Sequence, residues 1–386
     1  MNELAPTGRL GVYLHVPFCL RRCPYCDFTV AVMRTVPEAS FVDAVLRELE
    51  QRREEFDGRR LKTIYFGGGT PSLLSVASLA RLLEAVKAAA PERSPDAEVT
   101  LEVNPESVVE GWAEEVVAAG FTRVSLGAQS VNDSVLRQLG RNHTSSDLRR
   151  AVERLHGAGL QHLSVDLIYG APGATMAGFL EEVTTVAGWP EIDHVSAYEL
   201  TFEPRTAFTV AKERGRLTPW DDDLLASCFD EVEQRLAAAG FARYEISNFA
   251  RPGGVSRHNS SYWVGDEYVG LGPGAHSLRV DAASATVVRR ANDRSTRNYL
   301  SEEQGSSSAE HLSSETHLRE LLMLACRRVA PLSLTELRGR SGRVDSVLGP
   351  HLDRWVERGL CRVVEGEVHF TPEARRLADS LAAEIF

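Results

Sequence analysis

The feature that most limits what this chain can fold into is a regular alternation of strand-like and helix-like segments over its first 240 residues. Short runs rich in β-branched and aromatic residues alternate with stretches that carry apolar residues at helical spacing. This alternation predicts parallel strands joined by right-handed helical crossovers, which form an α/β fold with a partial (β/α)6 barrel. In such folds the functional groups collect at the carboxyl ends of the strands. The strand-like runs are residues 11–16, 62–66, 98–103, 122–127, 162–168 and 194–200.

The pattern changes after about residue 240. Residues 241–249 predict a further strand, residues 251–277 an ordered functional loop rich in Gly, His and aromatic residues, and residues 301–314 a polar, Ser-rich linker. An amphipathic helix is expected over 315–330, and residues 332–386 follow the order helix, helix, short hairpin and helix. The predicted domains are a core over residues 1–240, an extension over 241–300, a linker over 301–314 and a mostly helical, winged-helix-like domain over 315–386.

Charge and hydropathy exclude several classes of protein. The net charge of −11 argues against general nucleic-acid binding, which needs a basic surface. The C-terminal module has eleven Arg, no Lys and eleven acidic residues between residues 315 and 386, which is a poor electrostatic footprint for DNA. No run of about 18 apolar residues predicts a transmembrane helix, and residues 1–10 do not have the pattern of a secretory signal. We therefore expect a cytoplasmic protein that does not bind nucleic acid.

Three of the six cysteines form a compact motif directly after the first predicted strand. Cys19, Cys23 and Cys26 have the spacing C-x-x-x-C-x-x-C, and thiolates are ligands that suit iron–sulfur clusters or zinc. Three ligands leave one corner of a [4Fe–4S] cluster open for a small chelating ligand. The alternative is a zinc site with His15 as the fourth ligand, but zinc motifs usually come as two C-x-x-C pairs. The sequence therefore favours the cluster.

Glycine-rich or polar groups follow the later strands of the predicted barrel. Any one of them could be a helix cap or part of a surface ion pair, but their recurrence in strand order predicts a site that surrounds a polar cofactor. Three glycines would let the backbone approach a ligand closely, and an arginine could pair with a carboxylate through two parallel hydrogen bonds. The groups are Gly67, Gly68, Gly69 and Thr70 after the second strand, Glu102 after the third, Gln129 and Arg141 after the fourth, and Asp166 in the fifth.

The cysteine motif resembles that of the radical S-adenosylmethionine superfamily, in which S-adenosylmethionine chelates the fourth iron of a [4Fe–4S] cluster. Residues 12–28, 67–71, 101–105, 125–130 and 165–172 resemble the oxygen-independent coproporphyrinogen III oxidase family, and the likeness covers almost the whole chain. It implies cofactor-binding roles for matching residues. Tyr13, Gly68 and Glu102 match contacts of the cluster-bound S-adenosylmethionine, Tyr25 matches an aromatic near its adenine, and Gly69, Thr70, Gln129, Arg141 and Asp166 match positions around a second S-adenosylmethionine.

Two features place the chain within that family. The oxidases carry a fourth cysteine two residues after the triplet, and Phe28 stands at that position here. The string H-N-x-x-Y-W, which starts at His258, is similar to the signature of the HemW branch, the haem chaperones, as is the G-L-G-P-G-A-H-S run over residues 270–277. The resemblance implies that His258 contacts haem and could ligate its iron. The alternative is that His258 and His276 are hydrogen-bonded structural residues.

The resemblance as a whole implies a cytoplasmic haem chaperone on a radical S-adenosylmethionine scaffold. Its cofactors would be a [4Fe–4S] cluster, S-adenosylmethionine and haem, and its partners acceptor haemoproteins, with membrane-bound respiratory enzymes as one candidate. One alternative is oxidative decarboxylation of coproporphyrinogen III, against which Phe28 argues because its side chain cannot exchange protons or electrons. The other is a DNA-binding regulator with the cluster as sensor, against which the balanced charge of the C-terminal module argues.

The assignment of the cluster ligands can be tested directly. Replacement Cys23→Ala removes one of three thiolates, so the reconstituted protein is expected to lose the visible charge-transfer absorption of the cluster. Absorption spectra of anaerobically reconstituted variant and parent provide the measurement. An unchanged spectrum would show that Cys23 is not a ligand.

Overall fold

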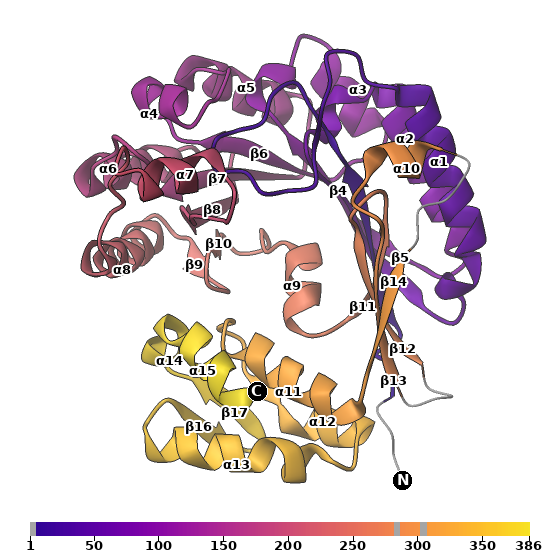
Figure 1. Cartoon of the computed structure of the whole chain (residues 1–386), viewed down its shortest axis with the longest axis vertical. Coiled ribbons are helices and arrows are strands. Elements are labelled where there is room, and N and C mark those ends of the chain that lie inside the picture. The colour runs from indigo at the N-terminus through magenta and orange to yellow at the C-terminus, as the bar shows by residue number, and fades with distance from the viewer. Residues whose placement is uncertain (1–4, 282–285, 302–306) are drawn as a thin grey trace.

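A single large sheet organises the chain. The computed structural model describes residues 5–281, 286–301 and 307–386, and Figure 1 shows a curved sheet with helices outside it and a smaller helical module at one end. The sheet has twelve strands. Their order is β14-β13-β12-β11-β1-β4-β5-β6-β7-β8-β10-β9.

The six strands predicted from the alternation form the centre of this sheet, side by side in sequence order. All five pairings among them are parallel. The partial barrel is therefore confirmed, and the carboxyl ends of these strands meet at one rim. The strands are β1 (Arg9–Val16), β4 (Arg60–Gly68), β5 (Arg93–Val103), β6 (Arg123–Gln129), β7 (His162–Tyr169) and β8 (His194–Glu199).

Helices cover the outer face of the parallel strands. Their apolar faces and the strand residues between them form the main core, in which Val12, Leu14 and Val16 are fully buried. Local capping fixes where the helices begin: the hydroxyl of Thr144 accepts a hydrogen bond from the backbone of Asp147, whose carboxylate accepts one in return. The helices are α1 (Glu38–Gln51), α2 (Val76–Ala89), α3 (Trp112–Ala118), α4 (Asp133–Gln138), α5 (Ser145–Gly157), α6 (Met176–Ala187), α7 (Ala207–Glu213) and α8 (Asp222–Ala238).

The segment after residue 240 differs from its prediction over residues 241–249, 251–277 and 301–314. Residues 241–249 do not form one strand but two short antiparallel ones, β9 (Ala242–Arg243) and β10 (Asn248–Ala250), because the chain reverses between them. The predicted loop over 251–277 is mostly regular structure. It contains α9 (Arg257–Trp263) and β11 (Glu267–Leu271), and β11 pairs with β1 in parallel on the side away from β4.

The sheet continues from β11 through three antiparallel strands, β12 (His276–Asp281), β13 (Thr286–Ala291) and β14 (Ser308–Leu312), and α10 (Thr296–Leu300) lies between the last two. The predicted linker over 301–314 therefore contains the edge strand of the sheet. It pairs with β13 residue by residue, and this pairing was not visible in its polar composition. Residues 302–306 of that predicted linker lie outside the described residues.

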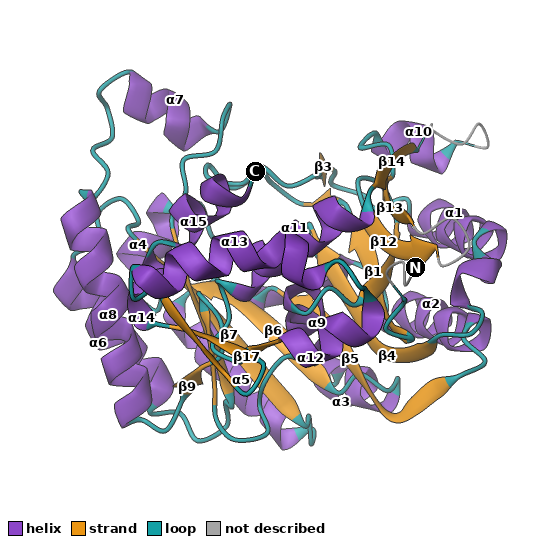
Figure 2. Ribbon diagram, turned by 90° about the horizontal axis from the view of Figure 1, so that it is seen from below, coloured by secondary structure: helices purple, strands orange, loops and turns teal. Residues whose placement is uncertain are grey.

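The C-terminal module has the predicted order of helix, helix, hairpin and helix, and Figure 2 shows its helices in front of the strands. Its core also includes Leu278 and Val287 from the extension, so the module packs on β12 and β13. The proposed division into domains at residues 240, 300 and 314 stays a prediction. The elements are α11 (Ser314–Ala325), β15 (Leu332–Ser333), α12 (Leu334–Arg340), α13 (Val344–Glu357), β16 (Cys361–Val364), β17 (Glu367–Phe370), α14 (Pro372–Arg376) and α15 (Ala378–Ile385).

Within the described ranges, none of the helices is both long and apolar enough to cross a membrane.

The close approach of the neighbouring strands β11 and β12 can be tested at Gly270. A Cβ at this position would overlap the carbonyl oxygen of His276, so Gly270→Ala is expected to lower the free energy of unfolding by about 3 kcal/mol. The control Gly339→Ala lies in α12 with open space around it, and there we expect a gain of roughly 0.5–1 kcal/mol. Urea denaturation measures both changes. Equal stabilities of the two variants would contradict the close approach of β11 and β12 at Gly270.

Candidate functional site

The three cysteines lie in the loop that follows β1 and that β2 (Phe18–Cys19) and β3 (Ala31–Val32) hold at its two ends. All three side chains are half-buried. The loop contacts the end of β4 and the segment after α4, because Cys19 Sγ lies 3.6 Å from the hydroxyl of Thr70 and Cys23 Sγ lies 3.9 Å from a guanidinium nitrogen of Arg141. Burial raises the pKa values of the Cys19 and Cys26 thiols, and the neighbouring cysteines raise them further. The thiols are therefore close enough to influence each other.

The donor set fits a cluster better than a single ion. In the parts of the chain that the structure describes, no three His, Cys, Asp or Glu side chains surround one ion position. A [4Fe–4S] cluster takes each thiolate on a different iron, so its ligands need not converge on one point. Both ring nitrogens of His15 are engaged, with Tyr13 Oη at 3.1 Å and the carbonyl oxygen of Thr29 at 2.7 Å. The zinc alternative with His15 as fourth ligand therefore has no support in the geometry.

The glycine loop at the end of β4 packs directly against the start of the cysteine loop. Gly68 has a φ of 112°, and a Cβ there would lie 2.5 Å from the His15 ring. A Cβ on Gly69 would lie 2.7 Å from the carbonyl oxygen of Phe18. Only glycine fits at these positions. The sequence analysis predicted that the backbone needs close approach here, and the structure shows that the cysteine loop itself supplies part of the crowding.

Glu102 joins the glycine loop to the barrel wall. Its carboxylate accepts hydrogen bonds from Tyr65 Oη at 2.7 Å and from the backbone N–H of Gly68 at 3.0 Å. Burial raises the pKa of Glu102 to about 7, although these hydrogen bonds oppose the shift. A carboxyl group with this pKa can bind a cationic group in its ionised form and can release a proton when it does so.

The two predicted aromatic contacts are well packed. Tyr13 stacks on Tyr65 with ring centroids 5.9 Å apart and an interplanar angle of 27°. Tyr25 lies between Cys23 and Cys26 and packs against Phe208 at a centroid distance of 6.3 Å. Burial raises the pKa of both phenols, so both are neutral at physiological pH.

Arg141 joins the end of β5 to β6. Its Nη2 donates to the side-chain oxygen of Asn104 at 2.6 Å and to the carbonyl oxygen of Gly127 at 2.7 Å. Its Nε is buried and has no hydrogen-bond partner among the described residues. An unpartnered buried donor of this kind fits a ligand carboxylate or another acceptor.

Gln129 and Asp166 complete the predicted set. Gln129 ends β6 with a φ of 68°, an uncommon backbone conformation for a residue with a side chain. Asp166 accepts hydrogen bonds from the hydroxyl of Ser125 at 2.9 and 3.0 Å, and burial raises its pKa. The structure thus places the predicted cofactor residues of β1, β4, β5, β6 and β7 on one barrel, while their individual ligand contacts stay predictions.

His258 occupies a different environment from the one its predicted haem ligation requires. Its side chain is 1% exposed, and its two ring nitrogens lie 2.8 Å from Thr63 Oγ1 and 2.9 Å from Tyr262 Oη. Its ring also stacks on Tyr65 at 4.8 Å. Burial lowers the pKa of His258 to about 3, so the imidazole is neutral. This geometry favours the structural alternative, because iron ligation would have to break one of the two hydrogen bonds.

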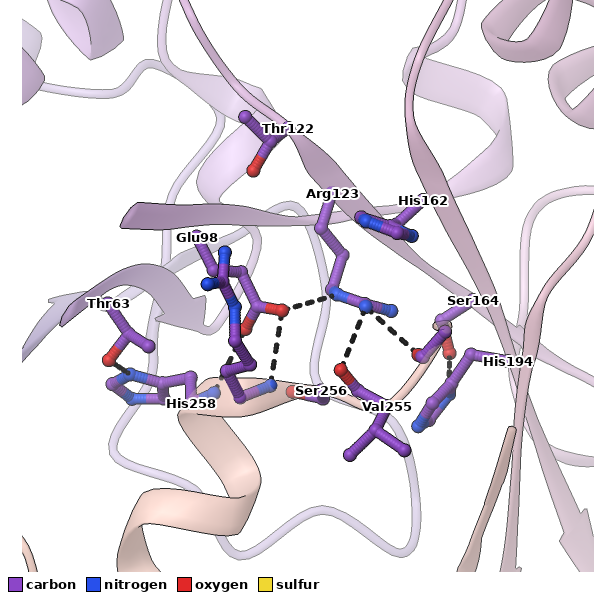
Figure 3. Close-up of polar contacts among 12 residues, drawn as sticks. Thr63, Glu98, Thr122, Arg123, His162, Ser164, His194, Val255, Ser256 and His258 are labelled. Carbon is purple, nitrogen blue, oxygen red and sulfur yellow. Dashed lines mark hydrogen bonds and ion pairs between the residues drawn. The ribbon is translucent and has the colours of Figure 1, made fainter. Parts of the chain in front are cut away.

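A buried ion pair that the sequence analysis did not assign to the site holds the helix of His258 (Figure 3). Glu98 accepts from Nε of Arg123 at 3.0 Å and from the backbone N–H groups of Arg257 and His258 at 3.1 and 2.9 Å. Arg123 in turn donates to the carbonyl oxygens of Gly254 and Val255. The sequence contains one signal that could have revealed this ion pair. Each of two neighbouring strand runs, which are otherwise buried, carries a charged residue, Glu98 in one and Arg123 in the other.

Comparison with known proteins agrees with the fold. The sequence model of the radical SAM superfamily matches residues 13–185 of this chain. Among solved structures, the oxidase HemN from Escherichia coli, described as a radical SAM enzyme, superposes with a TM-score of 0.81 at 21% identity, over 98% of this chain and 90% of that one. This likeness shows the fold. Fold and site together define a radical SAM protein, a class that implies a [4Fe–4S] cluster and S-adenosylmethionine.

Relatives found by sequence identify the family within this superfamily. The haem chaperone HemW of Escherichia coli is 34% identical over 93% of this chain and 92% of its own length. HemW of Mycobacterium tuberculosis is 46% identical over 70% of each chain, and that of Bacillus subtilis is 29% identical over 96% of this chain and 97% of its own. The chain belongs to the HemW family of the radical SAM superfamily.

The role of the buried ion pair can be measured by unfolding. Glu98→Ala leaves the Arg123 guanidinium without its buried partner and removes the acceptor at the start of α9, so we expect a loss of about 3–5 kcal/mol in the free energy of unfolding. The control is Asp96→Ala in the same strand, which removes an exposed partner of Arg257 and should leave the urea midpoint nearly unchanged. Similar midpoints for both variants would refute the role of Glu98.

Proposed function

We propose that this protein is a haem chaperone on a radical SAM scaffold. It binds haem, holds a [4Fe–4S] cluster on Cys19, Cys23 and Cys26, binds S-adenosylmethionine, and delivers haem to acceptor haemoproteins in the cytoplasm or at a membrane-bound respiratory enzyme. The proposal is supported by relatives named haem chaperone that cover most of the chain.

The observation that carries the proposal is Phe28. It stands in the cluster loop where the oxidases have their additional cysteine, and its side chain is 59% exposed. A benzyl side chain has no ionisable or redox-active group, so it cannot take the part of a thiol in porphyrinogen oxidation. Transfer of haem needs no such group.

The arrangement of the site suggests roles for its residues. The cluster supplies a one-electron centre when it is bound. The carboxylate of Glu102 and the backbone of Gly68 lie where they can hold an amino group, and the unpartnered Nε of Arg141 can meet an acceptor. Thr70 contacts both Cys19 and Asn104, so it ties the cluster loop to the end of β5.

Product analysis separates the chaperone from the oxidase. The reconstituted protein is incubated anaerobically with S-adenosylmethionine, reductant and coproporphyrinogen III, and porphyrins are separated by chromatography. We expect no decarboxylated product, and transfer of bound haem to an apo-haemoprotein in a separate experiment. Formation of protoporphyrin over many turnovers would overturn the proposal in favour of the oxidase. A Cys23→Ala preparation controls for decarboxylation that does not depend on the cluster.

The pKa of Glu102 predicts how the binding of S-adenosylmethionine depends on pH. An ammonium group binds the ionised carboxylate, and a group with a pKa of about 7 is mostly protonated at pH 6. Affinity should therefore rise about fivefold between pH 6 and pH 7 and should level off above this range. Equilibrium dialysis with labelled S-adenosylmethionine measures the change. Glu102→Gln should bind more weakly and without this dependence, and an equally steep profile in that variant would exclude Glu102 as the cause.

A further inference from the structure

A cavity lies between the barrel and the C-terminal module, which we call the interdomain cavity. It has a volume of about 910 Å³. One wall consists of the ends of β7 and β8 with α8, and α9 closes one side; the opposite wall is formed by the helices α14 and α15, which Figure 1 shows across from α8 and α9. We propose that the interdomain cavity is the haem site of this protein. This inference rests on the proposed function and adds the place and the residues of binding.

The first argument comes from the H-N-x-x-Y-W string. Asn259, Tyr262 and Trp263 line the interdomain cavity, whereas His258 is not among its lining residues. The imidazole of His258 instead hydrogen-bonds to Tyr262 Oη and so holds that ring in place. The string therefore presents its aromatic members to the cavity, and its histidine acts as a positioning residue.

The second argument is the size and surface of the cavity. Sites for cofactor-sized ligands have volumes of roughly 300–1,000 Å³ and mostly apolar walls with a few polar groups. Aromatic and aliphatic side chains line the barrel side of the interdomain cavity, including Tyr198, Leu225, Phe229, Ile246 and Trp263, whereas the C-terminal module contributes Ala378 and charged side chains. Such walls suit the faces of a planar tetrapyrrole.

The third argument is one guanidinium that makes no ion pair of its own among the described residues, because Glu233, the carboxylate that acts on it electrostatically, is paired with Arg243. Arg375 lines the cavity and donates to the carbonyl oxygen of Phe370, but it makes no ion pair with a carboxylate in the described part of the chain. The two other arginines of the lining are occupied: Arg376 pairs with Asp230 on α8 at 3.0 and 2.6 Å, and Arg327 pairs with Asp379. Arg375 is therefore suited to a propionate.

Acidic residues also line the cavity, and they must be compatible with a dicarboxylate ligand. The carboxyl groups of the lining are those of Glu199, Asp222, Glu245 and Asp379, and burial raises the pKa values of Glu199 and Glu245. A raised pKa lowers the free-energy cost of protonating Glu199 and Glu245 beside a propionate. Asp379 is paired with Arg327, and Asp222 also lines the wall, so Arg375 is the side chain of the lining that we assign to a propionate.

A blocking substitution tests the site. Ala226 is an exposed residue of α8 that lines the cavity, so Ala226→Trp would fill space without burying a new group in the core. We expect at least a tenfold weaker binding in haem titrations followed at the Soret band. Ala237→Trp is the matched control, because it is exposed on the same helix and does not line the cavity.

A charge substitution tests the propionate contact. Arg375→Gln should weaken binding of haem and of iron-free protoporphyrin IX about tenfold, but should leave binding of protoporphyrin IX dimethyl ester unchanged. Arg362→Gln, an exposed arginine on β16 outside the cavity, is the control and should match the parent.

The outcomes separate the two proposals. If the parent binds haem and both Ala226→Trp and Arg375→Gln give its titration curve, the cavity is not the site, while the chaperone function stands. If the parent shows no saturable haem binding, both proposals are wrong. If circular dichroism shows that Ala226→Trp does not fold, the comparison of Arg375→Gln with Arg362→Gln decides.

Discussion

The ion pair between Glu98 and Arg123 is the interaction on which the rest of the site depends. Both side chains are about 98% or more buried, so neither charge can be solvated by water. Both make hydrogen bonds instead to the segment that leads into α9: Glu98 accepts from its first backbone N–H groups, and Nη2 of Arg123 donates to the carbonyl oxygens just before it, while Nη1 of Arg123 has no partner among the described residues. A charge pair of this kind gives little net stability over an apolar pair, but breaking it is costly. It therefore fixes one position of α9 inside the barrel.

From that fixed helix, aromatic contacts extend toward the cofactor residues. Tyr262 meets His258, His258 stacks on Tyr65, and Tyr65 hydrogen-bonds to Glu102, whose other oxygen accepts from Gly68. The segment that carries the H-N-x-x-Y-W string and the glycine loop beside the cysteines are thus joined by an unbroken series of packed rings and hydrogen bonds. These contacts connect the proposed haem site with the proposed cluster site, although Cys26 and His258 are 232 positions apart in the sequence.

Local patterns in the sequence were sufficient for the six parallel strands, the helices between them and the order of the C-terminal module, because each depends on apolar spacing within a short window. They were not sufficient for β11. It lies in the segment over residues 251–277, whose Gly, His and aromatic residues suggested a loop, and its partner β1 lies more than 250 residues earlier. The same limit applies to His258, whose string was recognised but whose two hydrogen bonds come from the fold. The interdomain cavity could not be predicted at all, since its walls come from separate segments between residues 169 and 379.

The open sheet has a consequence for the behaviour of the protein at high concentration. A closed barrel has no free strand edges, but this sheet ends in β9 on one side and β14 on the other. An unpaired edge can recruit a strand from another molecule. Here β9 is only two residues long, and β14 carries Glu310, which pairs with Arg289 on the neighbouring strand. A short edge and a charged edge both hinder the addition of a strand from another molecule. The barrel can therefore have two free edges without promoting aggregation.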